Sequence, residues 1–308
     1  MAVDSLRLVV AINPNASFGK NPTAGPRVVS ALRTAGHDVA MLQADSYEAL
    51  RADVEAALGT SPDGLIVVGG DGMVHLGAEF CSRHNMPLGV IPAGTGNDLA
   101  RHLGIPLDIE QAQEVLLDCL GQDPVSIDHG VSRGAEGADQ PFACVLSAGF
   151  DAIVNERANR LSFPKGRHRY TLALLIELVK LRPLTYTLEI DGTTHTAKYL
   201  LVAVANAQSF GGGMKVTPQA SVTDGYLDVF TLQPLSRLAF LRIYPRVFAG
   251  THVTDSRVSI TRAQSVRIES KGIVAYADGE RVGSLPLEVT LNKGGLKVFA
   301  PALAPTGV

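Results

Sequence analysis

The first 92 residues alternate between short apolar runs and longer stretches with helical periodicity. Four apolar runs have the length and composition of buried strands, at residues 6–12, 37–42, 64–68 and 88–91. Three stretches between them repeat apolar side chains at helical spacing, at residues 25–35, 46–58 and 74–84. This order predicts a parallel sheet covered by helices on both faces, with any ligand at the carboxyl ends of the strands.

After about residue 127 the pattern changes to short strand-like runs separated by Gly, Pro and polar turns. These runs cover residues 142–147, 185–190, 198–205, 226–232, 258–260, 265–269 and 287–291. Two helical segments, 162–181 and 235–249, interrupt them. We therefore predict a Rossmann-like α/β domain over residues 1–126 and a β-sandwich-like domain with inserted helices over 127–308. The last segment, about 295–308, is long enough to return to the first domain.

Composition narrows the class of protein. A chain of 308 residues that is 46% apolar can form two cores, and its net charge of -3 gives no overall reason to expect nucleic acid. Three widely spaced cysteines fit neither a disulfide framework nor a zinc cluster, which favours a reducing, cytoplasmic compartment. Residues 171–181, the most apolar helical stretch, are too few to cross a bilayer that needs roughly 20. We expect any membrane contact to be peripheral.

Three small-residue loops follow three of the predicted strands, at residues 13–20, 69–72 and 92–98. Glycine lets backbone N–H groups approach a phosphate closely, Lys20 adds positive charge, and Asp71 can hold Mg²⁺. The first loop alone is compatible with an ordinary strand-to-helix turn. Because the three loops fall on one edge of the sheet, together they predict a nucleotide site.

The motif Gly69-Gly70-Asp71-Gly72, followed some twenty residues later by Pro-Ala-Gly-Thr-Gly-Asn-Asp at 92–98, resembles the bacterial diacylglycerol kinase and lipid kinase family, to which sphingosine kinases are related. Further matches follow the family's order at Asn13-Pro14, 148–151, Asn206 with 210–213, 223–225 and 277–280. The resemblance implies that the first domain binds ATP, that the second is a β-sandwich, and that a lipid enters a cleft between them.

The resemblance also implies roles for single residues. Asp278 is expected to be the general base for the lipid hydroxyl, and Glu280 to help place Mg²⁺ and the phosphates, although Asp278-Gly279 alone also reads as a hairpin turn. The implied nucleotide and phosphate contacts are Asn13, Ser17, Lys20, Gly69, Gly70, Asp71, Gly72, Thr95, Asn97, Asp98 and Arg101.

A separate magnesium loop is implied at residues 221–226, where Asp224 would supply a carboxylate and Ser221 and Tyr226 backbone carbonyls. The alternative is a solvated turn. Thr223 stands where the family often carries a second acid. Met73 replaces a threonine that commonly follows the second loop, Ala44 stands where relatives often have a threonine, and the first loop is longer than usual.

The resulting hypothesis is an ATP- and Mg²⁺-dependent lipid kinase that converts diacylglycerol, or a related lipid, to a lipid phosphate. Two alternatives stay open: a kinase of a soluble substrate such as NAD, and a non-catalytic nucleotide-binding regulator. The sequence leaves open which lipid is used and the oligomeric state, a homodimer included. Basic residues either dock on anionic headgroups at the inner face of the membrane or form a solvated face; they are Arg157, Arg160, Lys165, Arg167, His168, Arg169, Lys180 and Arg182.

Overall fold

The computed structural model describes residues 5–13, 23–134, 137, 139–161 and 167–303. The chain divides into two compact units, Met1–Asp128 with Lys293–Val308, and His129–Asn292. Two strands contribute to both, since β5 (Val125–Gly134) and β16 (Leu287–Phe299) each run across a boundary between the units.

The first unit is built on a parallel sheet in the order β2-β1-β3-β4. Its strands are β1 (Arg7–Ile12), β2 (Asp38–Gln43), β3 (Gly64–Gly69) and β4 (Leu88–Pro92), and the end of β16 lies parallel to β4, with Val298 opposite Leu88. Every residue of β3 and β4 is buried, as an apolar run in a central parallel strand should be, whereas β2 at the edge buries Val39 alone.

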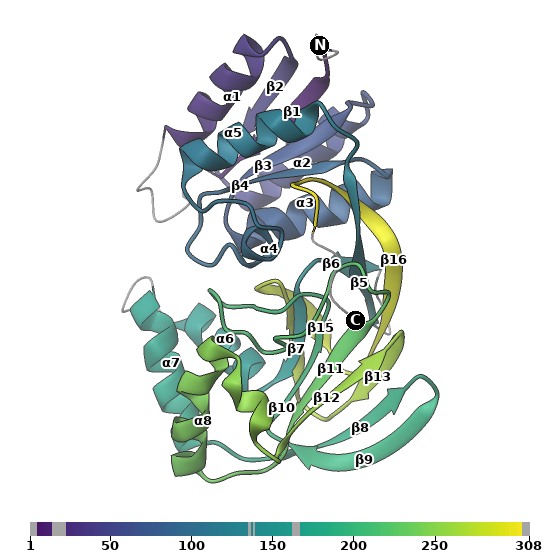
Figure 1. Cartoon of the computed structure of the whole chain (residues 1–308). Helices are drawn as coiled ribbons and strands as arrows, with labels where there is room; N and C mark the ends of the chain where they lie inside the picture. The colour runs from purple at the N-terminus through teal and green to yellow at the C-terminus, as the bar shows by residue number, and fades with distance from the viewer. Residues whose placement is uncertain (1–4, 14–22, 135–136, 138, 162–166, 304–308) are drawn as a thin grey trace. The chain divides into compact units, whose positions relative to one another are not determined.

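Helices cover both faces of this sheet. They are α1 (Ala24–Thr34), α2 (Tyr47–Leu58), α3 (Asp71–His84), α4 (Asp98–His102) and α5 (Ile109–Leu120). The helix α1 packs with α5, and α2 packs with α3 (Figure 1). The sequence reading missed α5, although Asp108 caps it and Ala112, Leu116 and Cys119 form its buried stripe.

The second unit is a β-sandwich-like domain. One sheet has the antiparallel order β12-β11-β10-β7-β14-β15, and a second group runs β16-β13-β8-β9. The strands are β6 (Gln140–Phe142), β7 (Val145–Gly149), β8 (Leu184–Ile190), β9 (Thr193–Tyr199), β10 (Leu201–Ala205), β11 (Leu227–Leu232), β12 (Val258–Ala263), β13 (Ser265–Glu269), β14 (Val274–Ala277) and β15 (Glu280–Ser284). Side chains from both groups, among them Leu146, Val229, Val266 and Val289, share one core.

Three helices form a smaller cluster on this unit: α6 (Phe150–Arg160), α7 (Arg167–Val179) and α8 (Arg237–Ala249). The sequence reading missed α6 and the strands β5, β14 and β15, and it ended the last strand near residue 291 instead of Phe299. Within the described residues, no helix is long and apolar enough to span a membrane.

Candidate functional site

In the first unit, the loops after β3 and β4 pack directly against each other. The backbone N–H of Ala93 donates to the carbonyl of Gly69 at 2.8 Å. A Cβ added to Gly94 would lie 2.2 Å from the Cα of Gly70. Because real Cβ atoms do not approach backbone so closely, glycine at position 94 is required for this contact.

Asp71 ties the two loops together. Its Oδ1 accepts the N–H of Asp98 at 2.9 Å, and its Oδ2 accepts the N–H of Asn97 at 3.2 Å. Asp71 is also the first residue of α3, with Gly70 as N-cap, so its carboxylate lies where two helices begin. It is half-buried. A single accessible carboxylate fits Mg²⁺, which proteins usually bind through one or two carboxylates together with substrate phosphates.

The third loop is braced by Asn97, which adopts a left-handed conformation with φ 56°. Its amide accepts the N–H of Gly94 and donates to the carbonyl of the same residue, both at 3.0 Å. Thr95 is exposed, Asp98 is buried, and Arg101 donates through Nε to the carbonyl of Gly96 at 3.1 Å. Of this loop's candidates, Thr95 is therefore the one whose hydroxyl faces solvent, whereas Asn97 holds the loop's shape.

The first predicted loop begins at the same edge of the sheet. The N–H of Asn13, directly after β1, donates to the carbonyl of Val68 at 3.2 Å. Ser17 and Lys20 lie outside the described residues. Met73 is 1% exposed and packs against Gly69, so the residue that replaces the family's threonine belongs to the core.

In the second unit, Asp278 and Gly279 form the two-residue turn between β14 and β15. Both have positive φ, 50° and 89°, as a tight hairpin turn of primed type requires. The Asp278 carboxylate is buried and accepts three backbone N–H groups, from Ala143 at 2.7 Å, Cys144 at 2.9 Å and Val145 at 3.1 Å. Glu280, the first residue of β15, is half-buried.

Asn206 is buried and holds the segment that surrounds this carboxylate. Its Nδ2 donates to the carbonyl of Ala143 at 2.8 Å, and its N–H donates to the carbonyl of Cys144 at 2.8 Å. Asn206 is part of the family pattern in the sequence, but the pattern alone predicts no role for it. Residues 143–145 belong to the predicted strand 142–147, but the sequence did not identify them as site residues. They contribute backbone N–H groups, which residue identity does not reveal.

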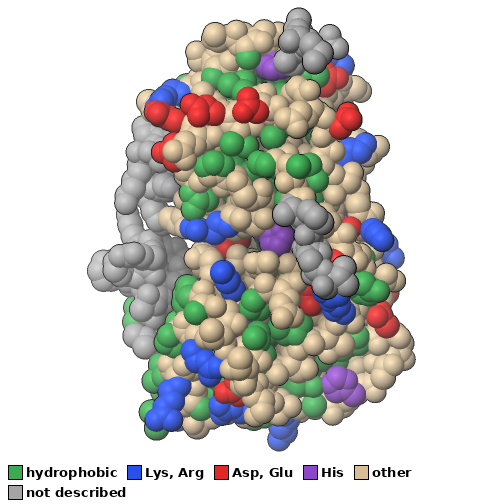
Figure 2. Space-filling view, in the orientation of Figure 1, with side chains coloured by type: hydrophobic (Ala, Val, Ile, Leu, Met, Phe, Trp, Pro, Cys, Tyr) green, Lys and Arg blue, Asp and Glu red, His purple; other side chains and the backbone are tan. Residues whose placement is uncertain are grey.

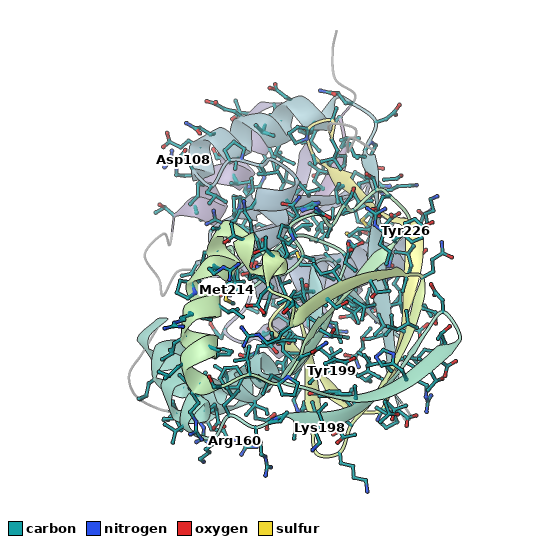
Figure 3. All side chains as sticks on the ribbon, turned by 60° about the horizontal axis from the view of Figure 1, so that its bottom comes forward. Asp108, Arg160, Lys198, Tyr199, Met214 and Tyr226 are labelled. Carbon is teal, nitrogen blue, oxygen red and sulfur yellow. The ribbon has the colours of Figure 1, made fainter. Side chains whose placement is uncertain are left out.

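In the predicted magnesium loop, the Asp224 carboxylate contacts a backbone N–H group and an arginine. Asp224 Oδ1 accepts the N–H of Tyr226 at 3.1 Å, while Oδ2 lies 3.3 Å from Nη2 of Arg262. That guanidinium also lies over the ring of Tyr226, 5.6 Å from its centroid. Tyr226, which Figure 3 labels, directly precedes β11. Asp224 Oδ2 is buried and has no hydrogen-bond partner among the described residues, so its counter-charge is the Arg262 guanidinium alone. With that cation beside it, the single carboxylate does not fit a divalent ion as well.

Asp228 is the nearest second acid to this loop. Burial, and then the neighbouring Asp224, raise the pKa of Asp228 to about 6, and Arg262 opposes the shift. Asp228 and Arg262 face each other across β11 and β12. Among the residues that the structure describes, no group of three or more His, Cys, Asp or Glu side chains could hold a metal ion.

Comparison with known proteins accounts for both units. Residues 7–131 match the model of the diacylglycerol kinase catalytic domain, and residues 144–300 match that of the YegS C-terminal NAD kinase beta sandwich-like domain. The chain is 37% identical over 297 residues to a diacylglycerol kinase of Mycobacterium tuberculosis (strain H37Rv), covering 96% of this chain and 95% of that protein. This chain belongs to the diacylglycerol kinase family. It is therefore a member of a lipid kinase family, and the predicted two-domain fold class is confirmed.

Solved structures show the same fold. A diacylglycerol kinase of Bacillus anthracis matches with a TM-score of 0.71 at 20% identity, over 99% of this chain and 98% of that one. An NAD kinase of Archaeoglobus fulgidus, crystallised with ATP, matches with a TM-score of 0.54 at 14% identity, over 95% and 92%. Membership of a kinase family makes the chain a phosphotransferase with ATP as phosphoryl donor.

Proposed function

We propose that the chain transfers the γ-phosphate of ATP to the hydroxyl of diacylglycerol and so produces phosphatidic acid. The observation that supports this most strongly is the 37% identity to a diacylglycerol kinase over nearly the full length of both proteins. Similarity of that extent includes the glycine loops of the first unit and the Asp278 turn of the second.

In the first unit, the two packed glycine loops are proposed to bind the phosphates of ATP. The backbone at Gly70 and Gly72, next to the N-terminus of α3, can approach an anion without side-chain interference. Thr95 would add its exposed hydroxyl, and Ser17 and Lys20 stay predicted contacts. Asp71 would hold Mg²⁺, which when bound neutralises charge on the transferring phosphate.

In the second unit, Asp278 is proposed to accept the proton of the lipid hydroxyl, with Glu280 beside it in sequence. The three N–H groups on its carboxylate fix one orientation, so the group is preorganised. Phosphoryl transfer does not require a strong base, because it depends mainly on positioning and charge neutralisation. A firmly held carboxylate is therefore suited to this role.

A test of the proposal is transfer of labelled phosphate from Mg-ATP to diacylglycerol in mixed micelles, followed by organic extraction. Wild type should yield labelled phosphatidic acid, and Asp71→Asn should lower the rate at least about 100-fold, because the metal and phosphate contacts weaken. The matched control is Asp53→Asn, an exposed carboxylate on α2, which should keep the wild-type rate.

A kinase of a soluble acceptor is the second candidate, favoured by the fold likeness to an ATP-bound NAD kinase. At 14% identity, that likeness concerns the fold alone. If wild type labels NAD or another water-soluble acceptor but no diacylglycerol, sphingoid base or glycolipid, the lipid proposal is wrong and this one replaces it. ATP binding without any turnover would instead indicate a nucleotide-binding regulator.

A further inference from the structure

The helix α8 carries an apolar stripe on its outward face. Leu238 is 74% exposed, and Leu241 and Phe248 are each 47% exposed. With exposed Pro245 these residues follow the three- and four-residue spacing of one helix face. A solvent-facing stripe of this kind needs an explanation, because the outer face of an ordinary surface helix is polar.

The outward stripe is not needed for the core of the unit. The opposite face of α8 buries Phe240 and Ile243, and Phe240 packs edge-on against Phe150 of α6 with ring centroids 5.0 Å apart. The helix therefore has two apolar faces, of which one is already used. Phe248 also contacts the ring of Tyr244 edge-on, with centroids 5.9 Å apart, and Tyr244 packs against this cluster. Substitutions at Leu238 and Leu241 should therefore leave the packing of α6, α7 and α8 intact.

Exposed apolar side chains concentrate on α7 and α8. Five of the eight large ones among the described residues lie on these two helices: Leu172, Val179, Leu238, Leu241 and Phe248. Arg237 joins the end of α7 to the start of α8, since it donates through Nε to the carbonyl of Leu178 at 3.1 Å and through Nη2 to that of Val179 at 2.6 Å. We call Val179, Leu238, Leu241, Pro245 and Phe248 the α7–α8 patch.

Positive charge surrounds this patch. The sequence of α8 contains Arg237, Arg242 and Arg246 and no Asp or Glu, and exposed Lys180 directly follows α7. In Figure 2, Lys and Arg side chains stand beside hydrophobic ones at lower left, over the part of the molecule where Figure 1 draws α7 and α8. An apolar stripe flanked by cations is typical of helices that lie in a membrane interface.

Of the basic residues singled out in the sequence, those of α6 support docking less well than Lys180. Arg157 pairs with the buried Glu177, and Arg160, at the outer end of α6 (Figure 3), pairs with Glu156. Lys165 lies outside the described residues. Arg157 and Arg160 are therefore already neutralised within the fold. In α8, Arg246 lies 4.0 Å from the Asp255 carboxylate, whereas Arg242 has no ion pair among the described residues.

We propose that the α7–α8 patch docks on a lipid bilayer that contains anionic headgroups. The choice of a bilayer as partner rests on the proposed function, since diacylglycerol resides in membranes. Charge complementarity supports it, because each Lys or Arg near an anionic leaflet contributes about 1 kcal/mol. A second copy of the chain is disfavoured, because a two-fold contact would bring the arginines of α8 against those of an identical helix.

The absence of tryptophan from the sequence allows a direct test. Leu238→Trp places a single indole in the patch, and Met41→Trp places one on exposed β2 of the first unit as a matched control. Vesicles of phosphatidylcholine with phosphatidylglycerol should shift the emission of the Leu238→Trp chain to the blue and leave that of the Met41→Trp chain unchanged. A shift in both chains, or in neither while the protein sediments with vesicles, would overturn the proposal.

A second variant measures what the patch contributes. Leu238→Ser with Leu241→Ser should lower vesicle partitioning roughly 100-fold, since two apolar side chains no longer enter the interface. Met41→Ser with Leu107→Ser, also exposed apolar positions, should have no effect. A blue shift that depends on protein concentration without vesicles would show that a second copy covers the patch, and would also overturn the proposal.

The experiment separates this inference from the proposed function. Vesicle binding is measured without ATP, so it can succeed even if diacylglycerol is not phosphorylated. Conversely, the Leu238→Ser, Leu241→Ser chain should phosphorylate a short-chain, water-soluble diacylglycerol at the wild-type rate and lose rate only on vesicles. Equal rates on vesicles for this variant and wild type would contradict docking while leaving the kinase proposal intact.

Discussion

At the residue scale, Asp278 combines a turn-forming conformation with a buried carboxylate. The two readings of its motif, hairpin turn and general base, are compatible, because the turn's positive φ directs the side chain to the N–H groups of residues 143–145. The observed structural role and the proposed chemical role therefore fall on one side chain, and a mutation at this position should affect both.

This overlap gives a prediction that compares two acids. Asp278→Asn should lower kcat about 1,000-fold through loss of a base and also lower the free energy of unfolding by about 1–3 kcal/mol, because an amide cannot accept all three N–H groups. Glu280→Gln, at a half-buried position, should lower kcat with little change in stability. Kinetics and urea unfolding on the same samples check this. Unchanged stability of Asp278→Asn would contradict the structural role.

Asp151, in the first turn of α6, is a half-buried residue whose two carboxyl oxygens are themselves buried. Neither oxygen has a hydrogen-bond partner in the described part of the chain. Burial raises the pKa of Asp151 to about 6, against a smaller opposing effect of nearby Ser147. Because the folded state then holds this proton more tightly than the unfolded state, the group destabilises the fold as pH rises from about 4 to about 6.

Asp151→Asn should remove this penalty. At pH 8 the variant should be more stable than wild type by up to about 3 kcal/mol, and this difference should shrink steadily as pH falls from about 6 to about 4, because the folded state then keeps the carboxyl protonated. Chemical denaturation across this pH range checks the prediction, with Asp53→Asn as an exposed control. A stability difference independent of pH would show that Asp151 is not the titrating group.

At the element scale, the contact between the loops after β3 and β4 depends on glycine. Gly94→Ala would force a methyl group to 2.2 Å from the Cα of Gly70, so the loops must separate. We expect kcat/KM for ATP to fall at least about 10-fold, because the phosphate-binding backbone moves. Gly59→Ala at the end of α2, where φ is -59°, is the matched control and should retain activity. A fully active Gly94→Ala would show that the contact has no part in nucleotide binding.

The loop before β11 makes a prediction about metal removal. Since Arg262 already faces Asp224, EDTA without nucleotide should leave the melting temperature of wild type unchanged. Arg262→Gln should create a Mg²⁺-dependent gain of about 2–4 °C, because the carboxylate then lacks its cation. Thermal melts with Mg²⁺ and with EDTA check this. Tightly bound Mg²⁺ in dialysed wild type, measured by elemental analysis, would contradict it.

At the scale of the whole molecule, the end of the chain completes the first unit. Val298 and Phe299 of β16 lie beside β4, and the Phe299 ring lies where a side chain at Gly64 would be. Phe299→Ala should lower the free energy of unfolding of the first unit by about 3 kcal/mol. Hydrogen exchange should accelerate in β1 and β4 and stay unchanged in β10 and β11. Equal acceleration in both units would show that they unfold together.

The sequence by itself determined the elements whose patterns are local. The parallel strands of the first unit are continuous apolar runs, its first three helices have clear periodicity, and the glycine loops follow the strands directly, so the α/β fold and the edge that carries the nucleotide candidates could be predicted. The short strands β14 and β15 were missed, because four or five residues of mixed character give no periodicity.

Tertiary structure decided everything that depends on partners distant in sequence. The N–H groups on Asp278 come from residues more than 130 positions earlier, and the cation beside Asp224 comes from the neighbouring strand β12. The helical segment at 235–249 was predicted, but which apolar face of α8 is buried depends on α6 and α7. A residue's identity determines which groups it can bind, and the packing of distant segments determines which of those groups it contacts.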